Sequence, residues 1–336
     1  MTADPHSTSP ETAAPRRSLL ERAAAPLLAL LFLAGLAGLA GTTGWDEVAA
    51  QVGRLGPWQI ALLLMLSLAN YALRGLRWHL FAHHLGLPTG PWQDLRHFLG
   101  GFAMVITPGR VGELVRMRWL KRETGWAYER TAPLALLDRA ADLAAMAILL
   151  GLSAALASSA LAGAVPVTLL ALAAAFLATR PRLVAGAVTL MHRATGRMPR
   201  LFARLRAAAR SLDRVAGWRV MLPALALGMA GWLAEGYALH LLLGWMGAEI
   251  GLGKAMAVFV FATIAGNLTG APGGLGGAEA AMIALLALDG VPMEISIPAT
   301  AIIRVTTLWF ALGIGLVIFP FAERLSLRGR HGLENR

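Results

Sequence analysis

Two Pro-Gly segments, each followed closely by a glutamate, are the parts of the chain whose residue types suggest chemistry. The first is PGRVGE at positions 108–113 and the second is PGGLGGAE at positions 272–279. A helix that begins behind such a break presents free N–H groups and the positive end of its dipole, which bind anions such as a phosphate. Each glutamate either neutralises its own helix end, or pairs with an arginine, binds a cationic or zwitterionic head group, or shuttles a proton. The candidate residues are Pro108, Gly109, Gly112, Glu113 and Arg116 in the first segment, and Pro272, Gly273, Gly274, Gly276 and Glu279 in the second.

Ionisable residues inside long apolar stretches complete the set of candidates. Arg139 has Asp138 beside it and Asp142 three residues on, an acid–base–acid group with helical i,i+3 spacing. Arg304 has no acidic residue within four positions, so its partner is distant in the sequence or is a lipid phosphate. Glu235 is the one acid of its stretch. Burial of an ionisable group in a membrane costs free energy, so each of these residues is by default a candidate for a functional site. The two arginines could instead extend to a membrane interface.

The composition indicates a membrane protein. Of 336 residues, 57% are apolar and 15% are charged, and the mean hydropathy is +0.61; a soluble domain has about 25% charged residues. The net charge of +11 comes from clusters of arginine between apolar runs, where it sets membrane orientation and contacts anionic head groups, so we expect no nucleic-acid partner. Cysteine is absent, which excludes thiolate metal sites. His79, His83 and His84 have no carboxylate close in sequence, and nucleotide-binding motifs are absent, so we expect neither a metal nor a cofactor.

Six runs are apolar enough to be expected to cross the membrane: 23–43, 58–76, 133–152, 163–179, 220–243 and 299–321. The span 58–76 ends at a basic flank that includes Arg74 and Arg77. The basic segments predict that both termini are cytoplasmic. We divide the chain into a disordered tail (1–22), an integral membrane domain (23–322) and a basic tail (323–336). Segment 180–219 is either a topogenic loop or an amphipathic helix on anionic lipid, with the helix residues Arg204, Leu205, Arg206, Arg210 and Leu212.

Two further apolar segments, 92–121 and 255–288, are interrupted by the Pro-Gly breaks, so each half is too short to cross. We expect both to be re-entrant hairpins of two half-helices. Pro108 and Pro272 are 164 residues apart, Tyr71 and Tyr237 are 166 apart, and Arg139 and Arg304 are 165 apart. The halves 58–152 and 220–321 therefore form an internal repeat. The topology inverts the second half, so its hairpin enters from the opposite side, as in many secondary transporters.

The sequence resembles the lysylphosphatidylglycerol synthase transmembrane family, also called the flippase-like domain family, from about residue 58 to residue 321, which is most of the chain. The residues that carry the resemblance are Pro108, Gly109, Arg110, Val111, Gly112, Glu113, Arg116, Asp138, Arg139, Asp142, Pro272, Gly273, Gly274, Leu275, Gly276, Glu279 and Arg304. Asp138 stands where the family usually has glutamate. The resemblance implies a stand-alone member, without the soluble synthase domain, that moves a lipid between the leaflets of a bacterial inner membrane. It also implies a link to enzymes of lipid or lipid-linked sugar synthesis.

The sequence thus predicts an all-α polytopic protein that translocates a phosphate-bearing lipid. Arg139 and Arg304 would hold the phosphate, while Glu113 and Glu279 would gate or couple the step. The alternatives are a membrane-embedded transferase with one of these glutamates as general base, and a non-catalytic partner of an envelope pathway. The lipid, the energy source and the oligomeric state stay open.

Overall fold

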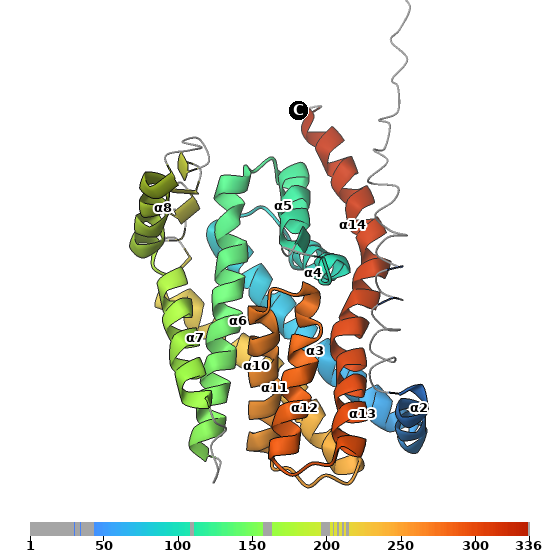
Figure 1. The fold of residues 1–336 in the computed structure, drawn as a ribbon. Coiled ribbons are helices and arrows are strands. Elements are labelled where there is room, and N and C mark those ends of the chain that lie inside the picture. Colours follow the sequence, from blue (N-terminus) through green and yellow to red (C-terminus); the bar gives the residue numbers. More distant parts are fainter. Residues whose placement is uncertain are drawn as a thin grey trace, which may run out of the picture.

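The computed structural model describes residues 44–107, 111–156, 163–195 and 215–334, with single residues at 30, at 34 and between 202 and 212. Every regular element in these ranges is a helix, which confirms the predicted all-α membrane protein (Figure 1). The span expected at 23–43, residues 108–110 and most of the segment 196–214 lie outside the described residues. The helices are α2 (Trp45–Arg54), α3 (Pro57–Leu85), α4 (Pro91–Gly100), η1 (Gly101–Met104), α5 (Val111–Thr124), α6 (Tyr128–Leu156), α7 (Ala164–Ala178), α8 (Pro181–Thr195), α10 (Trp218–Trp245), α11 (Leu252–Leu268), η4 (Pro272–Gly274), α12 (Gly277–Leu288), α13 (Met293–Arg304), the π-helix η5 (Val305–Trp309) and α14 (Phe310–Glu334).

Three helices of the described part are long and apolar enough to cross a membrane: α3, α10 and the run Met293–Gly329, in which α13, η5 and most of α14 are continuous. The pair α7 and α8 would be a fourth, although the two helices are bent by 87°. The 29 residues of α6 also have the length of a span, at about 1.5 Å per residue, but five of them are charged, three of these in the middle of the helix at Asp138, Arg139 and Asp142. The count of six spans stays a prediction.

Two helices extend beyond their predicted spans. Helix α3 continues past residue 76 to Leu85, so Arg74 and Arg77 lie inside the helix and are buried. Their expected place in a cytoplasmic flank is therefore wrong, because hydropathy does not distinguish a flanking arginine from one that is paired in the interior. The last helical run begins at Met293 rather than at 299, and it continues through the predicted tail to Glu334.

Each Pro-Gly segment lies between short helices, although residues 108–110 of the first are outside the described part. Helices α4, η1 and α5 occupy the upper part of the bundle in Figure 1, and α11, η4 and α12 occupy the lower part, so the two hairpins point toward each other from opposite ends. Their tips meet, since Ile106 at the end of the first packs in one cluster with Leu275 of the second and with Trp309 and Leu312. The arrangement agrees with the predicted inverted repeat.

Small residues hold the second hairpin closed. A Cβ atom on Gly266 of α11 would lie only 2.6 Å from the Cβ of Ala278 in α12. Lipid tails are as apolar as helix side chains, so close contact at small residues, rather than apolar burial, is what associates helices in a bilayer. Gly266 therefore sets the spacing between the two half-helices.

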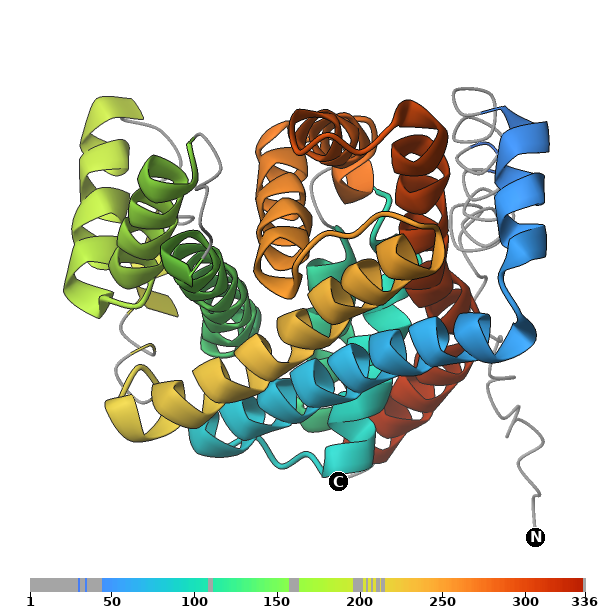
Figure 2. The same cartoon turned by 90° about the horizontal axis from the view of Figure 1, so that it is seen from below.

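The long helices of the two halves run beside each other. Figure 2 shows α3 and α10, the first helices of the two halves, packed along their lengths. Tyr71 of α3 also reaches the last helical run, where its hydroxyl donates to the Thr307 carbonyl in η5. A π-turn frees carbonyls from the regular i→i+4 pattern, so a side chain of the first half satisfies backbone of the second.

Candidate functional site

The two predicted glutamates pair with the two predicted arginines in the same way. In the first half, Arg139 Nε lies 3.0 Å from Glu113 Oε1. In the second half, Arg304 Nε lies 2.6 Å from Glu279 Oε1. Each pair joins the long helix of its repeat to the first turn of the half-helix behind the break. The same kind of arginine–glutamate ion pair thus occurs in both halves of the predicted repeat. Glu279 is the distant partner that the sequence led us to expect for Arg304.

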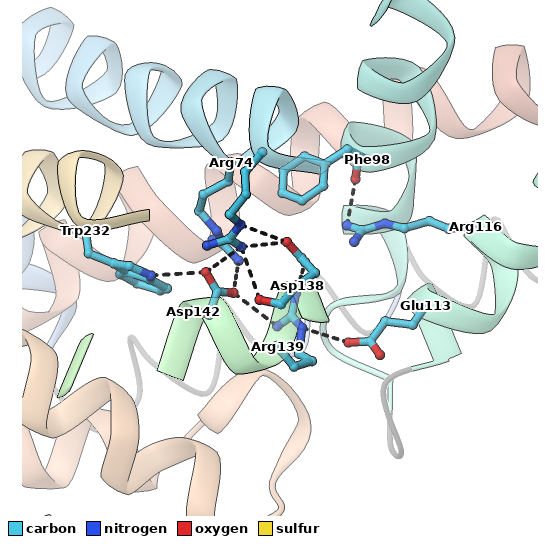
Figure 3. Close-up of polar contacts among 9 residues, drawn as sticks. Arg74, Phe98, Glu113, Arg116, Asp138, Arg139, Asp142 and Trp232 are labelled. Atoms are coloured by element: carbon cyan, nitrogen blue, oxygen red, sulfur yellow. Dashed lines mark hydrogen bonds and ion pairs between the residues drawn. The ribbon is translucent and has the colours of Figure 1, made fainter. Parts of the chain in front are cut away.

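A larger buried network surrounds the first pair, on the facing sides of α3 and α6 (Figure 3). Arg77 is fully buried and contacts Asp138 at 2.6 Å and Asp142 at 2.8 Å. Arg74 contacts Asp142 at 2.7 Å, and the indole N–H of Trp232 in α10 donates to the same carboxylate. Arg139 lies 3.1 Å from Asp138 and 3.6 Å from Asp142. Each buried charge therefore has partners of the opposite sign, as the low dielectric of the interior requires.

Helical spacing explains why these side chains meet. Arg74 and Arg77 are three residues apart on α3, and Asp138 and Asp142 are four apart on α6, so each pair occupies one face of its helix. The two arginines of α3 therefore face the two aspartates of α6, and Arg77 contacts both aspartates while Arg74 contacts one of them. The i,i+3 spacing of Arg74 and Arg77 is therefore a signal in the sequence that the two side chains share a helix face. The assignment of both residues to a basic flank did not take this signal into account.

Arg116 has a different environment from the other arginines. Its side chain is buried, and one N–H donates to the Phe98 carbonyl at 2.7 Å. Its guanidinium lies 4.5 Å from the centre of the Phe98 ring and within 6 Å of Trp78 and Phe102. Within the described residues no carboxylate lies within 4.0 Å of it. Aromatic faces and a backbone carbonyl thus stabilise a buried cation that has no ion pair there.

The break of the second hairpin is held to Arg304. Arg304 donates to the Gly273 carbonyl at 2.9 Å in addition to its pair with Glu279. Gly273, Gly274 and Gly276 all have positive φ values, a conformation that other L-residues rarely adopt. The glycines allow the loop to turn sharply under the guanidinium, so Arg304 is buried and does not extend to an interface.

The other candidates lie at or near this centre. Glu235 of α10 is buried beside Asn70 of α3 and lies within electrostatic reach of Arg74 and Arg304. Gly112 packs against the Gly101 carbonyl of the same hairpin. Pro272 opens the turn η4. Pro108 and Gly109 lie outside the described residues.

A second polar cluster joins α4 to α5, away from the buried centre. Glu123 accepts hydrogen bonds from Arg96 and Gln93, and its carboxylate lies 3.1 Å from the His97 ring. Burial acts to raise the pKa of Glu123, but the hydrogen bond with His97 and the charges of His97 and Arg96 outweigh burial and hold the pKa below its usual value. Nearby, His79 pairs with Asp94, so a carboxylate distant in sequence accompanies the histidines. Among the described residues no three His, Asp or Glu side chains gather as a metal site would require.

Comparison with known proteins gives a family match over most of the chain. The model of the family described as the lysylphosphatidylglycerol synthase TM region matches residues 26–315. Two relatives, both called UPF0104 membrane protein and both from Methanothermobacter thermautotrophicus, are 30% identical over 90 residues and 28% identical over 91 residues. The aligned segment is 27% of this chain and 27% of each relative, so the chain spans about a quarter of their length in these matches. The family match includes both hairpins and every arginine–carboxylate pair of the centre, and the chain belongs to the lysylphosphatidylglycerol synthase TM region family.

Proposed function

We propose that the protein moves a phosphate-bearing lipid between the two leaflets of a membrane, with the head group passing the buried charged centre. The observation that carries the proposal is the repeated pair: Arg139 with Glu113 and Arg304 with Glu279, at the tips of two opposed hairpins. Paired broken helices in an inverted repeat are an arrangement that secondary transporters use to hold a substrate near the bilayer midplane. Re-entrant placement of both hairpins is part of this proposal.

The chemistry of the centre suits a phosphate. Guanidinium groups bind phosphate oxygens through paired N–H donors, and they remain charged when buried. Arg116 has no carboxylate partner among the described residues, and Arg139 is about one-third exposed. A head group entering beside Arg139 would meet this cation first, because Arg116 is buried behind aromatic side chains. It would then compete with Glu113 for Arg139, so the ion pair acts as a gate.

An apolar recess supports the proposal from the side of the lipid tails. It has a volume of about 320 Å³ and is lined by Ala230, Leu233, Ala234, Tyr237 and Leu252. Four of these residues lie on α10, next to Glu235 in the sequence, and Leu252 begins α11, so an acyl chain in the recess would lie against the helix that carries Glu235. A translocated lipid needs this combination of an apolar surface for its tails and a polar interior for its head.

The basic residues favour a cytoplasmic position for one end of the bundle. Helix α8 and the end of α14 lie at the same end in Figure 1; α8 contains Arg182 and Arg193, and the end of α14 contains Arg324, Arg328 and Arg330. Cytoplasmic segments carry an excess of such residues. We therefore place this end and both termini in the cytoplasm, and the protein in a bacterial inner membrane.

Translocation can be measured with purified protein in proteoliposomes that contain head-group-labelled lipids of several classes. A membrane-impermeant quencher reports the fraction of label in the outer leaflet over time. We expect wild type to move one phosphate-bearing class, and Glu279→Gln and Glu113→Gln to slow that movement at least about tenfold, which corresponds to a barrier raised by about 1.4 kcal/mol.

The control is Glu294→Gln, which changes an exposed glutamate in the first turn of α13 and should leave the rate unchanged. Absence of movement of every lipid class by folded wild type would contradict the proposal. So would folded glutamate variants that are as fast as wild type. A chemically altered lipid product, detected by mass spectrometry, would instead indicate a membrane-embedded transferase.

A further inference from the structure

Glu235 differs from every other buried carboxylate of the described residues. Asp138 and Asp142 pair with arginines of α3 and α6, Glu279 pairs with Arg304, and Asp94 pairs with His79. Glu235 is 4% exposed, and no basic side chain of the described part lies within 4.0 Å of it. It is thus the one buried carboxylate there that no ion pair fixes.

Glu235 nevertheless lies between the two halves of the charged centre. Helix α3 places Asn70, Tyr71 and Arg74 near it. Helix α6 contributes Asp142, and α13 contributes Arg304, each within electrostatic reach. Helix α11 meets the same stretch of α10 at Gly236, where the side chain of Met256 makes the contact. A change in the charge of Glu235 would therefore be felt by an arginine of each repeat.

The fixed charges of the centre balance when all its groups are ionised. Five arginines face five carboxylates in the described part: Arg74, Arg77, Arg116, Arg139 and Arg304 against Glu113, Asp138, Asp142, Glu235 and Glu279. A phosphodiester head group carries one negative charge. Its entry would leave the interior with an uncompensated charge, which a low-dielectric environment strongly disfavours.

We propose that Glu235 takes up one proton for each anionic head group that enters the buried arginine network, so that lipid and proton move together. This inference rests on the proposed function and specifies its coupling. A proton on Glu113, Asp138, Asp142 or Glu279 would break an ion pair and leave an arginine without its partner. A proton on Glu235 breaks none. It removes one negative charge between Arg74 and Arg304, which is the charge that the phosphate then replaces.

The consequence is a defined linkage between pH and binding. Where Glu235 is ionised in the free protein, binding of a singly anionic lipid takes up one proton, and the affinity falls up to about tenfold per unit rise in pH. A zwitterionic lipid brings no net charge and takes up no proton. Comparison of the two lipids therefore distinguishes proton uptake that is coupled to lipid binding from a general effect of pH on the protein.

Proton uptake can be counted by titration calorimetry of purified wild type in nanodiscs, with dioctanoyl phosphatidylglycerol and dioctanoyl phosphatidylcholine as probes. Each titration is run in two buffers of different ionisation enthalpy, from about pH 6 to about pH 9. We expect a proton count for phosphatidylglycerol that rises toward one at the alkaline end, and a count near zero for phosphatidylcholine. Wild type that binds phosphatidylglycerol with no proton uptake at any pH would overturn the inference.

Variants then assign the proton. Glu235→Gln should bind phosphatidylglycerol with no proton uptake and without the dependence of affinity on pH, whereas the exposed Glu294→Gln should behave as wild type. Proton uptake that persists in folded Glu235→Gln would also overturn the inference, and if that variant does not fold, the count for wild type decides. Labelled-lipid movement by wild type without proton uptake would refute the coupling and leave translocation standing. Failure of wild type to move any lipid would refute the proposed function itself.

Discussion

Replacing Arg77 with methionine removes the cation that two buried carboxylates share. Arg77 is fully buried and contacts Asp138 at 2.6 Å and Asp142 at 2.8 Å. Removal of one partner from a buried ion pair costs about 3–5 kcal/mol, because the remaining charge stays desolvated. Arg139 still contacts Asp138 in the variant, and Arg74 and Arg139 still contact Asp142, so the lower end of this range applies.

The expected loss is therefore about 3 kcal/mol. At about 2–4 °C per kcal/mol, a scale taken from somewhat smaller domains, the midpoint of thermal unfolding should fall by about 6–12 °C. Tryptophan fluorescence of the protein in one detergent measures this midpoint, and Trp232 lies directly beside the network. Arg77→Met, Asp138→Asn and the double variant form a cycle in which the second change should restore part of the stability, since it removes the uncompensated carboxylate.

Lys254→Met is the matched control. Lys254 contacts Asp289 at 2.7 Å, but its side chain is 31% exposed. Exposed pairs contribute about 0–1 kcal/mol, so the same chemical change should lower the midpoint by less than about 4 °C. Equal shifts for Arg77→Met and Lys254→Met would refute the reasoning, because they would show that burial of the network carries no energetic weight.

Two further predictions concern the hairpins. Gly266→Ala should destabilise the protein by about 1–3 kcal/mol, because the new Cβ would lie 2.6 Å from Ala278; Gly253→Ala in the same helix has its nearest atom at 3.9 Å and should stabilise by up to about 1 kcal/mol. A neutral Gly266→Ala in the thermal assay would contradict the close packing of α11 on α12. Glu123 has a lowered pKa in the folded protein, so its stabilisation is present above the unfolded value near about 4.3 and is lost as the pH falls through the folded value. Glu123→Gln should therefore reduce the loss of stability between about pH 5 and about pH 3, and an unchanged acid limb would show that the His97 contact does not stabilise the fold.

The sequence predicted the parts of the fold that depend on spacing. Apolar length identified α3 and α10, and the Pro-Gly breaks identified both hairpins. The common offset of about 165 residues predicted a repeat in which Arg139 corresponds to Arg304, and each of these arginines pairs with the glutamate that follows its own Pro-Gly segment. These features are local or periodic, so one chain is enough to read them.

The network itself could not be predicted because its contacts are long-range. Arg74 and Arg77 pair with residues more than sixty positions away, and their i,i+3 spacing places them on one helix face without indicating which acidic residues they meet. Trp232 joins the network from a third helix. The glutamate partner of Arg304 is 25 residues away, across the loop between α12 and α13. Pairing of this kind depends on which helices pack together, and neither helix propensity nor hydropathy gives that information.

The π-turn in η5 is a feature in which the two halves differ. Tyr71 and Tyr237 occupy matching positions, yet Tyr71 donates to the Thr307 carbonyl in the π-turn, and α6, the helix equivalent to the one that contains this turn, has no π-turn. Tyr237 is partly exposed instead. A protein built from two copies of the first half would keep the arginine–glutamate pair in both copies but would lack the π-turn of η5. The two halves are thus not interchangeable, because a side chain of the first half completes the backbone of the second.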